Sequence, residues 1–81
     1  MKVIYKKLGR EKAFGLSDYG SNTIVIDSRL KGRKHLEVAL HESLHVYFPE
    51  KSETFITNTA RRLANILWRM NYRRVDNSVG I

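Results

Sequence analysis

The chain has 81 residues and a formal charge of +7 at pH 7, from 15 lysines and arginines against 8 acidic residues. This length predicts one domain over residues 1–81, with a small core and modest stability. The chain contains no cysteine, which excludes disulfides, thiolate metal ligands and a cysteine nucleophile.

The excess of positive charge bears on partners and location. It favours contact with polyanions such as nucleic acids, although an excess of one charge sign also keeps small proteins in solution. No run approaches the roughly 20 apolar residues that span a bilayer. The basic N-terminus lacks the apolar core of a signal sequence. We therefore expect a cytoplasmic protein that does not contact a membrane.

Three short segments of the N-terminal part predict β-strands. Residues 2–8 and 23–27 are rich in β-branched side chains, whereas the segment 13–17 is weakened by Gly15. A cluster of turn residues at 18–22 separates the second segment from the third. Three strands separated by turns predict an antiparallel meander.

Two helices are predicted after the strands. Residues 34–48 carry apolar side chains around most of a helix axis, which is typical of a buried helix, and Pro49 ends it. Ser52 is a good N-cap for a second helix, whose apolar positions follow the three-four spacing at Ile56, Ala60, Leu63, Leu67 and Met70. The predicted fold class is α+β, with a small antiparallel three-stranded sheet packed on two helices.

The first predicted helix carries the motif H-E-x-x-H, formed by His41, Glu42 and His45. Residues four apart lie on the same face of a helix. Both imidazoles can therefore reach one zinc ion, while Glu42 reaches a water on that ion. Burying these polar groups without partners is costly. Because a metal ion would satisfy both imidazoles, the sequence predicts a Zn²⁺ site here.

A catalytic zinc ion usually has three protein ligands. Glu53, at the start of the second helix, is the preferred third ligand because the apolar periodicity turns it inward. It could instead stabilise the helix dipole without a metal, and Glu50 is an alternative ligand from the preceding turn. We expect His41, His45 and Glu53 to bind zinc and Glu42 to be the catalytic general base.

Other polar residues have weaker predictions. Glu37 lies one turn before His41 and either accepts its second ring proton or is solvated. His35 is expected at the surface and Tyr47 in the core. The strand at residues 23–27 is a candidate edge with which an extended peptide could pair.

Three segments carry a family resemblance: TIVIDSRL, LEVALHESLHVYFPE and SETF, which fall within residues 22–70. They resemble the core of the zincin metallopeptidases. Within this class they look similar to the minimal gluzincin-like proteins of phages and prophages, and more distantly to the SprT-like and ImmA/IrrE-like groups. The resemblance implies that His41, His45 and Glu53 bind zinc and that Glu42 is the general base. No residue matches the tyrosine or histidine with which gluzincins steady the transition state.

Three functions are compatible with this sequence. The first is a zinc metallopeptidase that acts on a peptide or protein substrate. The second is a catalytically inactive, zinc-stabilised binding module for a host protein or nucleic acid. The third is a packing domain without a metal. We expect the substitution Glu42→Gln to abolish function only in the first case.

Overall fold

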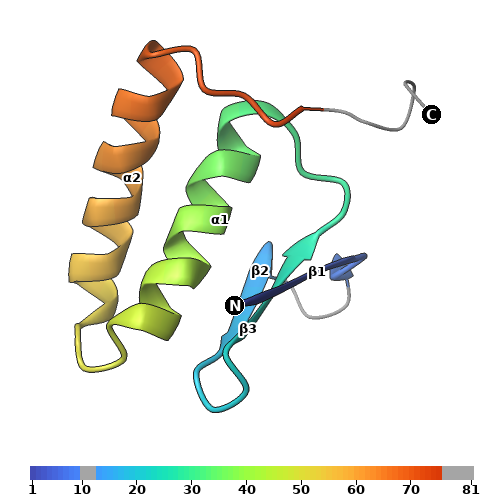
Figure 1. Cartoon of the computed structure of the whole chain (residues 1–81), viewed down its shortest axis with the longest axis vertical. Helices are drawn as coiled ribbons and strands as arrows, with labels where there is room; N and C mark the ends of the chain where they lie inside the picture. Colours follow the sequence, from blue (N-terminus) through green and yellow to red (C-terminus); the bar gives the residue numbers. More distant parts are fainter. Residues whose placement is uncertain (10–12, 76–81) are drawn as a thin grey trace.

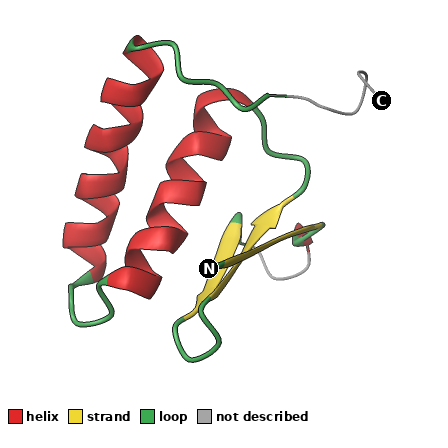
Figure 2. Cartoon of the chain, in the orientation of Figure 1, coloured by secondary structure: helices red, strands yellow, loops and turns green. Residues whose placement is uncertain are grey.

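The computed structural model describes residues 1–9 and 13–75 and belongs to the predicted α+β class. Its elements, in chain order, are β1 (Lys2–Lys6), β2 (Gly15–Asp18), β3 (Thr23–Asp27), α1 (Gly32–Tyr47) and α2 (Glu53–Arg69). Figures 1 and 2 show α1 between the sheet and α2. The sheet therefore packs mainly against α1, and α2 packs against the opposite side of α1. This differs from the prediction that the sheet packs on both helices.

The sheet is mixed, with the strand order β1-β3-β2. β1 runs parallel to β3, with Lys2 opposite Thr23, and β2 runs antiparallel to β3, with Asp18 opposite Thr23. The predicted antiparallel meander is therefore wrong, as is the prediction that residues 23–27 form an edge. β3 is the most apolar strand, and the centre of the sheet is the position that lets it pair on both sides and bury its side chains.

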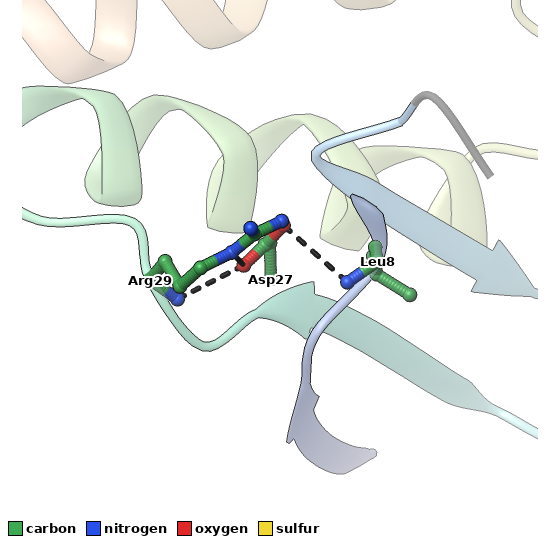
Figure 3. Close-up of polar contacts among 3 residues, drawn as sticks. All are labelled: Leu8, Asp27 and Arg29. Atoms are coloured by element: carbon green, nitrogen blue, oxygen red, sulfur yellow. Dashed lines mark hydrogen bonds and ion pairs between the residues drawn. The ribbon is translucent and has the colours of Figure 1, made fainter. Parts of the chain in front are cut away.

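One buried carboxylate ties the ends of β1 and β3 together. β1 ends at Lys6 rather than at residue 8, and Leu8 turns fully into the core. The Leu8 N–H donates to Asp27 Oδ2 at 3.4 Å, and Arg29 donates its backbone N–H and Nε to Oδ1 and its Nη2 to Oδ2 (Figure 3). Asp27 is only 3% exposed. The hydrogen bonds from the Arg29 side chain, and then from its backbone, hold the pKa of Asp27 well below its usual range.

The core lies between β3 and α1. Ile24 and Ile26 alternate along β3 and pack with Val38 and Val46 of α1. Ile24 and Ile26 therefore form the inward side of the strand. The first helix is not buried all round, however, because only Val38 and Val46 of its residues are buried and Tyr47 is 61% exposed. The prediction of Tyr47 in the core is wrong. Among the described residues, neither the sheet nor α2 covers the part of the α1 surface on which Tyr47 lies.

The buried stripe of α2 is narrower than predicted. Ile56, Ala60 and Ala64 are fully buried, whereas Leu63 and Met70 are exposed. Because α2 packs on a single neighbouring helix, a stripe of small residues suffices, and the small side chains let the two helix axes approach closely. The second helix is thus correctly predicted as an element, but its buried side is rotated relative to the predicted one, with Ala64 buried instead of Leu63.

Polar contacts fix the two helices as an antiparallel hairpin. Ser52 caps α2 as predicted, with its Oγ accepting the Phe55 N–H at 3.1 Å. Arg33 donates to Asn65 Oδ1 at 2.9 and 2.6 Å and so bridges the start of α1 to α2. The end of α1 therefore lies beside the beginning of α2. Neither helix in the described part of the chain has the length and apolar character needed to cross a bilayer.

Candidate metal centre

The three predicted ligands meet at the turn of the helical hairpin. His41 and His45 lie on successive turns of α1, with their Nε2 atoms 3.2 Å apart. Glu53 is the first residue of α2, and its Oε1 lies 2.9 Å from His41 Nε2. Its Oε2 lies 2.8 Å from His45 Nε2. One carboxylate thus bridges the two imidazoles.

Local sequence explains why Glu53 reaches this position. The connection at residues 48–52 reverses the chain, and the Ser52 cap fixes the first turn of α2. A carboxylate in that first turn is favoured by the helix dipole. Thr57, one turn later, donates its hydroxyl to Glu53 Oε1 at 3.4 Å. The Glu53 side chain is 66% exposed, so solvent reaches the cluster from one side.

The spacing of the donor atoms fits a tetrahedral cation. With zinc–nitrogen bonds of about 2.0–2.1 Å, two ligands at tetrahedral angles lie about 3.3–3.4 Å apart. The Nε2 atoms, at 3.2 Å, are close to that separation. The distances to the carboxylate oxygens are slightly shorter and are of hydrogen-bond length. Two histidines and a glutamate also form the donor set of several catalytic zinc sites. These residues therefore fit a zinc ion.

Glu42 adjoins this cluster on the inner side of α1. The backbone of Gly15 in β2 comes so close that an added Cβ would lie 2.8 Å from Glu42 Cγ and 3.1 Å from Oε2. Burial raises the pKa of the Glu42 carboxyl above its ordinary value, and the charge of His41 and a hydrogen bond with Ser17 offset this only in part. The result is a partly desolvated carboxyl group held between β2 and the metal cluster.

A cleft of about 340 Å³ opens beside His41 and Glu42. Phe14 and Lys34 form part of its wall, with the Lys34 ammonium 4.7 Å from the centre of the Phe14 ring. Thr57 of α2 also lines the cleft. A chemical group of a bound molecule therefore has room next to both the His41 imidazole and the Glu42 carboxyl.

The remaining sequence predictions have mixed outcomes. Glu37 accepts a hydrogen bond from Arg33 Nη1 at 2.6 Å, so its partner is a guanidinium rather than His41. Glu50 is exposed, and among the described residues the cluster that could hold a metal ion does not include it. His35 is only half exposed, because its Nε2 is hydrogen-bonded to the Tyr5 hydroxyl at 2.9 Å.

The sequence reasoning missed the contribution of β2 to the site. The sequence analysis treats Gly15 only as a weakness of the strand and assigns no role to Ser17. A glycine inside a strand also marks places where another group approaches the backbone closely. That signal was present at Gly15, and the group that approaches it is the Glu42 side chain.

Comparisons of the chain with protein-family models, with curated proteins and with solved structures gave no match.

Proposed function

We propose that the chain is a zinc-dependent metallopeptidase of the minimal zincin type that hydrolyses a peptide bond. The observation that carries this proposal is the convergence of His41, His45 and Glu53 at hydrogen-bond distances. A carboxyl group that can serve as a base, Glu42, lies beside this cluster and lines a cleft. A metal site alone would require neither the base nor the cleft.

Each of the four residues has a defined role in this proposal. His41, His45 and Glu53 hold the zinc ion, which when bound supplies Lewis-acid activation of water and of the scissile carbonyl. Glu42 accepts a proton from the attacking water at its carboxylate and delivers that proton to the leaving amine. The close approach of Gly15 restricts the positions open to the Glu42 side chain and so keeps it beside the cleft.

The sheet suggests how a substrate would be held. β2 pairs with β3 along one side only, so its other side is an edge, and β2 also packs against α1. An extended peptide can add to such an edge through main-chain hydrogen bonds. We assign this role to β2 in place of the central strand β3. The substrate class is therefore a peptide or an extended segment of a protein.

The test combines metal content with hydrolysis. Protein purified without an affinity tag is expected to contain one zinc ion per chain and to cleave members of a broad peptide library. Glu42→Gln should keep the zinc and lose cleavage, whereas Glu50→Gln, which makes the same change at an acid outside the cluster, should keep both. Stoichiometric zinc without cleavage of any library peptide would contradict the proposal.

A second candidate is a zinc-stabilised binding module without catalysis. The lining of the cleft favours this candidate. Among the described residues that line it, there is no tyrosine, and no histidine other than His41, that could stabilise a transition state. In this case ligand binding survives Glu42→Gln, which separates it from the peptidase.

A further inference from the structure

A second cavity, of about 450 Å³, lies at the end of the helical hairpin opposite to the metal centre. Its walls come from the start of α1, from Trp68 near the end of α2 and from residues 72–74. In Figure 1 these parts of the helices lie together, far from the turn that carries Glu53. We call this cavity the Trp68 pocket. It shares no lining residue with the cleft beside Glu42.

The first notable feature of the Trp68 pocket is a cation–π contact between an arginine guanidinium and the indole ring. The guanidinium carbon of Arg73 lies 3.3 Å from the centre of the Trp68 ring. Arg73 Nη1 also donates to the main-chain oxygens of Trp68 at 2.9 Å and of Tyr72 at 3.1 Å. These bonds hold the cation on the indole, while Arg73 Nε and Nη2 form no hydrogen bond within residues 1–9 and 13–75.

A second cation and aromatic pair lies beside the first. The guanidinium of Arg74 is 4.3 Å from the centre of the Tyr5 ring. The Tyr5 hydroxyl is hydrogen-bonded to His35 Nε2, and the two rings are stacked with their centres 5.8 Å apart. Within residues 1–9 and 13–75, neither Arg73 nor Arg74 forms a salt bridge to a carboxylate. No carboxylate of the described residues therefore neutralises their positive charge.

These features define the chemistry of an occupant. The pocket is lined mainly by apolar surface, from Leu36, Gly32 and the Trp68 ring, and its charged lining residues are Arg73 and Arg74, with no acidic residue. A fitting ligand therefore has a planar, largely apolar body with negative charge close to it. A nucleotide combines a base and a phosphate in this way, and proteins that bind single strands use aromatic and arginine platforms of this kind.

We propose that the Trp68 pocket binds one nucleotide of a single-stranded nucleic acid. The base enters the apolar cavity beside Leu36 and the part of Trp68 that lines it, with Arg73 remaining on the indole face, and the adjacent phosphates contact Arg73 and Arg74. The cavity volume is within the range of small-ligand sites. A duplex is excluded as a ligand for this pocket because its bases are held inside the stack. The formal charge of +7 attracts the strand as a whole. This proposal does not depend on the metallopeptidase function.

The only tryptophan of the chain provides a direct readout of the pocket. The full chain is titrated with an oligonucleotide of eight thymidines while Trp68 emission and the anisotropy of a labelled oligonucleotide are followed. We expect saturable quenching that coincides with the rise in anisotropy and weakens with salt. The same titration is made with the duplex form, with thymidine monophosphate and with an acidic peptide that contains tyrosine.

A matched pair of variants separates the pocket from general charge. Arg74→Gln should weaken oligonucleotide binding on the order of tenfold, as expected for loss of one charged hydrogen bond, and should reduce the salt slope by about 0.7. Arg62→Gln removes the same charge from an exposed position of α2 outside the pocket. It should leave the quenching intact and change the affinity by less than about twofold. Circular dichroism verifies that both variants remain folded.

Several results would overturn this assignment. Anisotropy changes without a change in Trp68 emission would place the strand elsewhere, as would equal losses in Arg74→Gln and Arg62→Gln. Binding of the duplex as tightly as of the single strand would also contradict it. If thymidine monophosphate or the acidic peptide bound as tightly as the oligonucleotide, the ligand would be a free nucleotide or a protein segment instead of a strand.

Discussion

The substitution Glu53→Gln should separate the stability of the metal-free chain from its response to zinc. The Glu53 side chain is 66% exposed, so its pairing with His41 and His45 is screened by solvent. Exposed ion pairs contribute about 0–1 kcal/mol to the free energy of unfolding. In the presence of a chelator, the unfolding free energy of Glu53→Gln should therefore stay within about 1 kcal/mol of the wild type.

Zinc should change this comparison sharply. At a free zinc concentration 100 times the wild-type Kd, binding to the folded state alone adds about 2.7 kcal/mol. For a domain of this size 1 kcal/mol shifts Tm by about 4–8 °C, so zinc should raise the wild-type Tm by about 11–22 °C. If losing the charged ligand weakens binding 100-fold, the same zinc concentration adds only about 0.4 kcal/mol, or about 2–3 °C.

The assay is thermal unfolding followed by circular dichroism, with chelator and with zinc buffered at one free concentration. Glu50→Gln is the matched control, because it removes the same charge from an exposed acid outside the cluster. It should retain the full zinc-induced rise in Tm. Our reasoning is refuted if Glu53→Gln keeps that rise, or if Glu50→Gln loses it.

The following predictions concern packing and charge elsewhere in the fold. Gly15→Ala should destabilise the chain by about 1–3 kcal/mol in denaturant unfolding, because the added Cβ would collide with Glu42 and Val38. Gly20→Ala is the control, since the atom nearest to its added Cβ is 3.5 Å away. Equal destabilisation by the two substitutions would exclude the collision. Ser52→Ala should cost about 0.5–2 kcal/mol through loss of the α2 cap, and an unchanged denaturation midpoint would contradict that role. The pKa of Asp27 is lowered in the folded state, so the ionised carboxylate stabilises the fold. This stabilisation is complete at pH values above the ordinary pKa of 3.8 and is lost as the pH falls below 3.8 toward the lowered pKa. With chelator present, acid unfolding of Asp27→Asn should lack this component, and identical pH profiles would refute the assignment.

The helical hairpin and its cluster were predictable because they depend on local sequence. The four-residue spacing of His41 and His45 places both rings on one face of the helix, independently of the rest of the fold. Pro49 and Ser52 fix where the first helix ends and the second begins, which brings Glu53 back to the two rings. The cluster therefore follows from interactions within a short stretch of chain.

The sheet was not predictable in the same way because strand pairing is non-local. The three strand segments were recognised, but nothing within 2–8 or 23–27 states that they pair in parallel. The exposure of Tyr47 and Leu63 has a similar origin, since helical periodicity identifies apolar positions without stating how many neighbours cover them. The Trp68 pocket also joins distant segments, so no local sequence pattern indicates it.

The three candidate ligands lie between residues 41 and 53, within the hairpin of α1 and α2, and none comes from the sheet. Short-range contacts of this kind form early during folding, whereas pairing of β1 with β3 must first close a longer loop. A cation could therefore be captured while the strands are still unpaired, and its capture would hold the hairpin as a template on which β2 and β3 dock. If the chain is the zinc peptidase proposed above, the supply of metal during synthesis would then govern the yield of native protein as well as its activity.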